Sequence, residues 1–261
     1  MSYEFILYEK ADHIAYLTLN RPEVLNALHV PAHIECAAAL EDFENDTDAW
    51  VLIVNGTGER AFCAGMDLRY RPAEGTAPLQ IPPGGFAGLT NPRGCKITKP
   101  IIAAVHGYTL GGGLELAMAC DLIVAADNTT FGLPEVKRGI MAGGGGVHRL
   151  PRQLPLKVAM GYLLTGKNMP AQEAERWGLV NEVVPVPELM DAARRWAVEI
   201  TEAAPLSVRA TKQASMLGME TSLEEAYNTS YPASQKMRGS NDSREGVAAF
   251  GERRKPNWTG T

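Results

Sequence analysis

The chain has 261 residues, 45% of them hydrophobic and 21% charged, which is the composition of a soluble globular protein with room for a sizeable core. Its 25 lysines and arginines against 30 aspartates and glutamates give a formal net charge of −5. Because nucleic-acid binding requires a basic patch, this balance excludes nucleic acid as the main partner.

Targeting signals and metal-binding patterns are missing from the sequence. No apolar run is long enough to span a bilayer, and the N-terminal segment lacks the basic start, apolar run and cleavage site of a signal peptide. A cytoplasmic protein without a membrane partner is therefore expected. The four cysteines form no CxxC pair and have no histidines at ligand spacing, which predicts free thiols and no metal site.

The first part of the chain predicts strands and one helix. Residues 3–8 and 13–20 alternate apolar and polar side chains, which predicts a hairpin. Residues 31–43 carry apolar side chains at helical spacing, and residues 50–54 form a short apolar strand. Residues 61–68 predict a strand that leads through small residues toward a helix, where backbone N–H groups could face a ligand.

A glycine-rich junction lies near the centre of the chain. An apolar strand over residues 101–105 precedes three glycines, residues 111–113, and a helix over residues 114–120. The first N–H groups of a helix have no intrahelical acceptor, so they can hold an anion or a developing oxyanion. Glu115 is the only charge in this apolar stretch, and the local sequence leaves it as either a helix cap or a catalytic carboxylate.

Other loops and strands surround this junction. Residues 71–95 contain five prolines and five glycines without a clear period, and their place between the two junctions favours a lid or pocket wall. Residues 122–126 predict another buried strand. Glu135 follows a proline and is the second carboxylate of interest, although its local sequence is also that of a solvated loop residue.

Beyond residue 154 the pattern becomes helical and suggests a helical C-terminal subdomain. The predicted helices cover residues 156–164, 171–177, 187–202, 206–217, 223–235 and 242–250. With the preceding strands, they predict an α/β protein.

Four stretches together resemble the enoyl-CoA hydratase/isomerase (crotonase) superfamily. They are LNRPEVLNAL at residues 19–28, AFCAGMDL at 61–68, VHGYTLGGGLELAMACD at 105–121 and FGLPEVKRGIMAGGGGVHRLPR at 131–152. Further similarity, in LTGKNMPAQEAERWGLVNEVVP and EGVAAFGERRKPNW, extends over nearly the full length. The resemblance implies a crotonase-like α/β spiral of ββα units over residues 1–195 and a C-terminal helical trimerisation subdomain over residues 196–261. Such trimers commonly pair into hexamers.

The resemblance also implies roles for matching residues. Met66 and Gly112 match the two main-chain N–H donors that hold the oxygen of an acyl thioester, and Glu115 and Glu135 match the paired carboxylates of hydratases. In that chemistry water adds across the 2,3 double bond of an enoyl-CoA. Family members suggest Glu115 for deprotonating water and Glu135 for protonating C2. The division stays open because two acids that share one water titrate together.

By resemblance, coenzyme A is the carrier of the substrate, and neither a metal nor a redox cofactor is implied. Its adenine and pantetheine are expected against the main chain near Val24, Ala64 and Leu68, with Asp67 capping a helix beyond them. The candidate cations for its phosphates are Arg21, Arg69 and Lys255.

The leading prediction is an enoyl-CoA hydratase, a hydro-lyase that needs both glutamates. A carnitinyl-CoA dehydratase is the close alternative, because residues 84–90 and the LPEVKRGI stretch resemble that branch, and a double-bond isomerase is a third chemistry. From a different class, a non-catalytic acyl-CoA-binding scaffold would be marked by loss of an acid or an oxyanion glycine. The sequence retains both.

Overall fold

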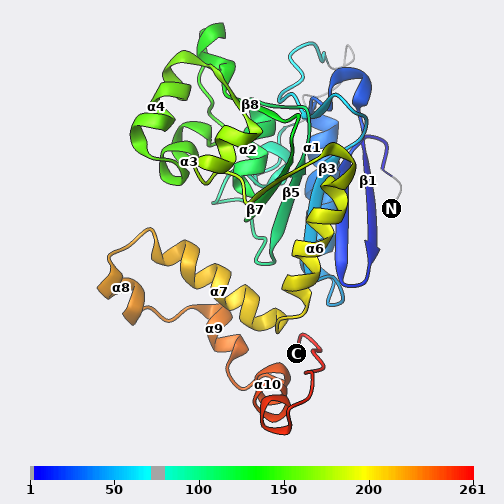
Figure 1. The fold of residues 1–261 in the computed structure, drawn as a ribbon, viewed down its shortest axis with the longest axis vertical. Helices are drawn as coiled ribbons and strands as arrows, with labels where there is room; N and C mark the ends of the chain where they lie inside the picture. The colour runs from blue at the N-terminus through cyan, green and yellow to red at the C-terminus, as the bar shows by residue number, and fades with distance from the viewer. Residues whose placement is uncertain (1–2, 72–79) are drawn as a thin grey trace.

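The computed structural model describes residues 3–71 and 80–261, which form two β-sheets flanked by helices (Figure 1). The larger sheet has the strand order β1-β2-β3-β5-β7-β10, and the smaller has the order β4-β6-β8-β9. The strands of the larger sheet are β1 (Ile6–Ala11), β2 (Ile14–Leu19), β3 (Val51–Gly56), β5 (Ile101–Val105), β7 (Leu122–Ala126) and β10 (Glu182–Val184). Those of the smaller sheet are β4 (Ala61–Cys63), β6 (Tyr108–Leu110), β8 (Thr130–Gly132) and β9 (Asn168–Pro170).

Successive strands alternate between the two sheets, so that the chain advances as a spiral. Strands β3, β5 and β7 pair in parallel in the larger sheet, and the strands that follow them, β4, β6 and β8, pair in parallel in the smaller one. Helix α2 (Gly112–Ala119) follows β6 directly. The predicted crotonase-like α/β spiral is confirmed, and β5 and β7 have the predicted bounds.

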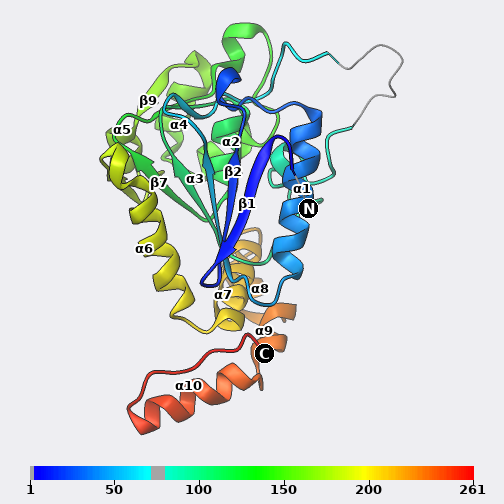
Figure 2. The same cartoon turned by 90° about the vertical axis from the view of Figure 1, so that its right-hand side faces the viewer.

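The larger sheet is covered on both faces. In β5, Ile101, Ala103 and Val105 point into the core shared with α1 and α2, whereas Ile102 and Ala104 face α6. This alternation explains why β5 is an uninterrupted apolar run with every residue buried. Figure 2 shows helices α1 (Val30–Asn45) and α6 (Leu189–Thr201) on opposite sides of the sheet.

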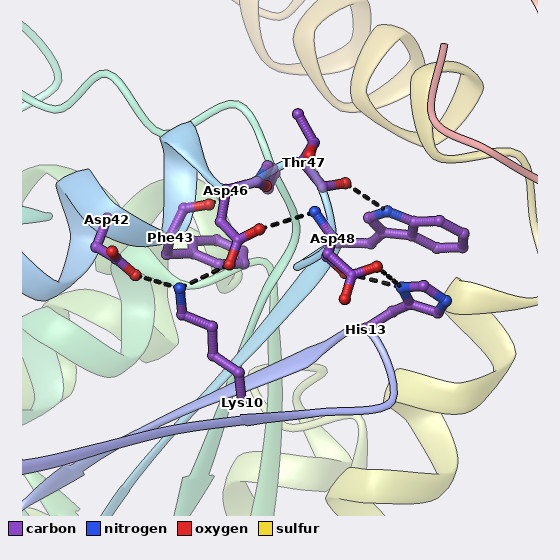
Figure 3. A network of polar contacts seen from close by, with 9 residues as sticks. Lys10, His13, Asp42, Phe43, Asp46, Thr47 and Asp48 are labelled. Carbon is purple, nitrogen blue, oxygen red and sulfur yellow. Dashed lines mark hydrogen bonds and ion pairs between the residues drawn. The ribbon is translucent and has the colours of Figure 1, made fainter.

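A polar network ties the N-terminal hairpin to the end of α1 (Figure 3). The strands β1 and β2 pair antiparallel, which confirms the predicted hairpin. Lys10 Nζ lies 2.5 Å from an Asp42 carboxylate oxygen and 2.6 Å from one of Asp46. The His13 ring stacks on Trp50 with ring centroids 3.8 Å apart. These contacts fix the C-terminal end of α1 against the hairpin.

The remaining helices form two groups (Figure 1). Beside the spiral lie α3 (Gly146–Gln153), α4 (Leu156–Thr165) and α5 (Ala171–Arg176). Extending away from it toward the C-terminus are α7 (Pro205–Gly218), α8 (Leu223–Asn228), α9 (Pro232–Met237) and α10 (Asn241–Glu252). The single helix predicted over residues 223–235 is wrong, because Pro232 keeps Tyr231 extended and separates α8 from α9.

The predicted boundary between residues 195 and 196 falls inside α6, and the nearest break between helices is at residues 202–204. The division into two domains stays a prediction. Within the described ranges, no helix combines the length and apolar character needed to cross a bilayer.

Candidate active site

Two backbone amides without a backbone acceptor lie where β4 and β6 end. These strands are neighbours in the smaller sheet, and each runs into a glycine-containing turn. Gly65 has a φ of +97°, and a Cβ there would stand 2.9 Å from the Gly112 nitrogen, so only glycine allows this approach. Among the described residues, neither the Met66 N–H nor the Gly112 N–H donates to a backbone acceptor. Gly112 is the first residue of α2, where no intrahelical acceptor exists.

The Met66 turn is held by the loop that precedes α1. The Leu28 N–H donates to the Gly65 carbonyl at 2.8 Å, and the Asp67 N–H donates to the Leu28 carbonyl at 2.9 Å. Met66 is thus the bridge residue opposite Leu28, and its own N–H points away from that loop. The helix predicted to follow residues 61–68 is wrong, because residues 64–71 form this bridge and a turn.

Glu115 lies in the first turn of α2 and is only 5% exposed. Its Oε1 accepts a hydrogen bond of 2.8 Å from the N–H of Gly146, the first residue of α3. A Cβ on Gly144 would overlap the other carboxylate oxygen, so the glycine run lets the turn approach the carboxylate. Glu115 therefore caps α3 and not its own helix.

Glu135 reaches the same place from η3 (Pro134–Arg138), a short 3₁₀ helix that follows β8. Its Oε1 lies beside Gly111, where a Cβ would be 3.1 Å away. Its Oε2 is buried and has no hydrogen-bond partner in the described part of the chain. The structure therefore brings Glu115 and Glu135 to the N-terminal end of α2, beside the Gly112 amide.

Burial raises the pKa of both carboxyls above its ordinary value. For Glu115, hydrogen bonds from Gly146 and Gly144 and the charge of Arg149 oppose the rise in pKa. For Glu135, a hydrogen bond with its own backbone opposes the rise, and the charge of Glu115 adds to it. Both carboxyls are therefore easier to protonate than an exposed glutamate, and the charge of one affects the pKa of the other.

The Glu135 carboxyl should make the stability of the fold fall as the pH rises. Because its pKa is higher in the folded chain, its contribution is complete below the ordinary value of 4.5 and is lost as the pH rises through the folded value. Glu135→Gln removes this titration, so we expect its melting temperature to exceed that of the wild type by more at about pH 7 than at about pH 4. Calorimetry at both pH values measures the difference in melting temperature between the variant and the wild type. An equal difference at the two pH values would contradict the prediction.

An aromatic side chain packs against Gly112. Phe86, in η2 (Phe86–Gly88), is 6% exposed, and a Cβ on Gly112 would stand 2.5 Å from its ring. The ring packs edge-on against His33 of α1 with centroids 4.6 Å apart. Phe86, in the described part of segment 71–95, thus packs against the start of α2, and a lid or pocket wall stays a prediction. Residues 72–79 lie outside the described residues.

Arg21 and Asp67 pair with each other. Arg21 Nη2 lies 3.0 Å from Asp67 Oδ2, and the two side chains are 12% and 10% exposed. The other Asp67 carboxylate oxygen accepts the Arg69 N–H at 3.1 Å. The predicted helix cap at Asp67 is wrong because residues 68–71 form no helix. Contact of Arg21 with a phosphate of coenzyme A stays a prediction.

Most of the other residues predicted to contact coenzyme A lie in the loop before α1 or in the turn after β4. Val24 ends the short helix η1 (Pro22–Val24), and the Ala64 N–H donates to the Leu25 carbonyl at 3.0 Å. Leu68 and Arg69 are exposed in the turn after Met66. Lys255 is exposed in the tail after α10, on a different part of the chain. Contact of any of them with coenzyme A stays a prediction.

Sequence reasoning missed Phe86 and Arg149 as members of this site. Phe86 lies in a segment without period, so no local pattern marks it. Arg149 is one of two arginines in VHRLPR, and their spacing does not show which is buried. In the structure burial lowers the pKa of the Arg149 guanidinium, and the charge of Glu115 partly offsets this.

Comparison with known proteins places the whole chain in one family. A family model described as enoyl-CoA hydratase/isomerase matches residues 9–261. The chain therefore belongs to the enoyl-CoA hydratase/isomerase family, the crotonase superfamily that its motifs resemble.

Particular relatives cover nearly the full length. The chain is 42% identical to (E)-benzylidenesuccinyl-CoA hydratase from Thauera aromatica, covering 98% of this chain and 99% of that protein. It is 44% identical to carnitinyl-CoA dehydratase from Proteus mirabilis, covering 94% of each. Among solved structures, enoyl-CoA hydratase from Mycobacterium marinum has a TM-score of 0.90 at 41% identity, covering 98% of this chain and 99% of that one.

Proposed function

We propose that this protein is an enoyl-CoA hydratase, which adds water across the 2,3 double bond of an unsaturated acyl-CoA thioester. Four groups that meet at the N-terminal end of α2 carry the proposal. They are the free amides of Met66 and Gly112 and the carboxyls of Glu115 and Glu135. Membership of the hydratase/isomerase family and the hydratase and dehydratase names of the relatives support it.

The two amides are proposed to form the oxyanion hole. As an oxygen from water bonds to C3, negative charge develops on the thioester oxygen, and fixed N–H donors stabilise that charge. Loss of one such donor costs roughly 3 kcal/mol in comparable sites. The donors are already oriented, because the peptide groups on both sides of Met66 are bonded to Leu28 and Gly112 begins a buried helix.

Glu115 suits the role of base and Glu135 that of acid. Hydrogen bonds from the glycine turn favour ionised Glu115, which takes a proton from water as the water oxygen bonds to C3. Glu135, protonated beside that charge, gives its proton to C2 as the enolate collapses. Proton return from Glu115 to Glu135 completes the cycle, and this scheme requires neither a metal nor a redox cofactor.

The test is to offer the pure protein crotonyl-CoA, longer 2-enoyl-CoAs and crotonobetainyl-CoA while following loss of the conjugated thioester's ultraviolet absorption. Dehydration is the same step in reverse, and carnitinyl-CoA dehydratase is the second candidate activity. The 44% identity with carnitinyl-CoA dehydratase from Proteus mirabilis favours this second candidate. Hydration of none of these thioesters would overturn the hydratase proposal, and migration of a double bond without hydration would indicate an isomerase.

Gly112→Ala should lower kcat for hydration by roughly 10²-fold, because a displacement of about 1 Å at a positioned group has an effect of this size. The new Cβ would meet the Phe86 ring and displace the helix start. Gly161→Ala in α4, where a Cβ meets nothing within 4 Å, is the matched control. Equal rates for the two variants would show that the Gly112 amide does not act in the reaction.

We also propose a cytoplasmic homotrimer that can pair into a hexamer. Helices α7 to α10 carry more exposed apolar side chains than a monomer usually leaves in water. The most exposed are Val247 at 76%, Leu223 and Tyr227 at 86%, and Phe250 at 88%. Light scattering in solution measures the oligomeric state.

A further inference from the structure

The Arg21–Asp67 pair joins two family motifs that lie far apart in the sequence. Arg21 belongs to LNRPEVLNAL and Asp67 to AFCAGMDL. The guanidinium contacts the Asp67 carboxylate at 3.0 Å, and both side chains are nearly nine-tenths buried. The same guanidinium also donates from Nη1 to the Ala27 carbonyl. Arg21 therefore binds the loop before α1 and the turn after β4 at the same time.

These contacts lie on both sides of Met66. Ala27 precedes Leu28, the residue that forms the bridge with Met66, and Asp67 follows Met66 directly. The two backbone hydrogen bonds of this bridge fix the peptide groups next to the Met66 N–H. The Arg21–Asp67 ion pair reinforces these two hydrogen bonds, because a movement of either loop must also break the ion pair.

The loop itself needs such support because its backbone is strained. Leu25 and Asn26 have φ angles of 58° and 53°, in the left-handed region that residues with a Cβ rarely adopt. The Asn26 side chain accepts the Arg21 N–H at 2.9 Å and donates to the Ala61 carbonyl at 2.8 Å. Arg21 and Asn26 thus hold a strained loop in the one position that places Leu28 beside Met66.

The Arg21 and Asp67 side chains each need the opposite charge of the other to stay buried. Burial raises the pKa of Asp67, but the hydrogen bond and charge of Arg21, with backbone hydrogen bonds from Arg69 and Tyr70, outweigh it and lower the pKa below its ordinary value. Loss of one partner would leave the other charged and poorly solvated, which drives that side chain toward water. The turn between Gly65 and Arg69 would move with it.

We propose that Arg21 and Asp67 are positioning residues, whose ion pair aims the Met66 N–H at the thioester oxygen. This inference rests on the proposed function, since it assigns the Met66 amide to the oxyanion hole. Neither residue contacts the reacting atoms. Their effect passes through the backbone from Ala27 to Leu28 and from Leu28 to Met66.

Asp67→Asn tests the pair with little change in shape. We expect kcat for crotonyl-CoA to fall by roughly 10- to 100-fold while KM changes less than about threefold, because the oxyanion interaction strengthens in the transition state. The second readout needs no turnover. The carbonyl stretch of bound butyryl-CoA labelled with ¹³C at C1 should move back toward its value in free solution. The double variant Arg21→Gln/Asp67→Asn, which leaves no buried charge unpaired, should recover part of both losses.

Glu44→Gln is the matched control. Glu44 forms an ion pair of 2.8 Å with Arg209, and the two side chains are 17% and 25% exposed, but this pair joins α1 to α7. It should lower the melting temperature without changing kcat or the carbonyl stretch. If Asp67→Asn behaves in the same way, the pair is only structural and the inference fails. If Asp67→Asn does not fold, Arg21→Lys carries both readouts.

The two proposals fail in different ways. A wild-type protein that shifts the carbonyl stretch of bound butyryl-CoA without hydrating any enoyl-CoA would overturn the proposed reaction and leave the positioning role intact. A wild-type hydratase whose Asp67→Asn and Arg21→Lys variants keep the wild-type stretch and kcat would overturn only the positioning role.

Discussion

Glu115→Gln should lower kcat for enoyl-CoA hydration by about 10²- to 10⁴-fold, the size of effect that a positioned general base supplies. Glutamine keeps a carbonyl oxygen that can accept the Gly146 N–H, so the start of α3 stays capped. It cannot take a proton from water at neutral pH. The loss should therefore fall on kcat, while affinity for butyryl-CoA measured by calorimetry remains close to that of the wild type.

Glu199→Gln controls for the loss of a negative charge, because Glu199 is exposed on α6 outside the candidate site. It should hydrate crotonyl-CoA at the wild-type rate. A Glu115→Gln variant that also kept that rate would remove Glu115 from the chemistry and leave it only as the cap of α3.

Glu135→Gln should cause a loss of similar size, about 10²- to 10⁴-fold in kcat, for a different reason. Its buried Oε2 has no partner among the described residues, so the proton of the neutral acid can be given to C2. Glutamine fills the same space but has no transferable proton. Hydration of crotonyl-CoA and dehydration of 3-hydroxybutyryl-CoA should fall together, since one transition state serves both directions.

The pH dependence of the residual rates separates the two roles. The wild-type rate should fall on the acid side as the base is protonated and on the alkaline side as the acid ionises. Residual activity in Glu115→Gln should lose the acid limb, and that in Glu135→Gln should lose the alkaline limb. Reversed behaviour would exchange the assignments of acid and base.

The local sequence pattern was sufficient to predict an element where the burial of its faces can be inferred from its own residues. Strands β5 and β7 were predicted to the residue because both of their faces are buried, which leaves continuous apolar runs. The segment 223–235 failed because its helical spacing continues through Pro232, whose effect falls on the residue before it. The helix expected beyond Asp67 failed because Met66 pairs with the distant residue Leu28 and residues 68–69 form a turn.

The candidate site could be predicted from the sequence only where a single residue stands out from its neighbours. Glu115 stands out as a charge in an apolar run, whereas Glu135 is marked only by its place after a proline and received a catalytic role through resemblance to a family. The partnership of Arg21 with Asp67 could not be predicted, because the sequence suggested a phosphate-binding cation for Arg21 and a helix cap for Asp67, and nothing local links the two. Phe86 needed the fold as well, since only packing on α1 and α2 shows that its ring faces Gly112.

The pairing of β4 with β6 sets the distance between the two proposed amide donors. Neighbouring strands stand about 4.8 Å apart. Two N–H groups that reach one oxygen along its two lone pairs, each at about 2.9 Å, stand roughly 5 Å apart. Met66 and Gly112 each follow one of these paired strands, so the strand spacing is of the size that the proposed oxyanion hole requires. The loops that contact the acyl group can therefore differ in sequence while the spacing of the two proposed donors stays the same.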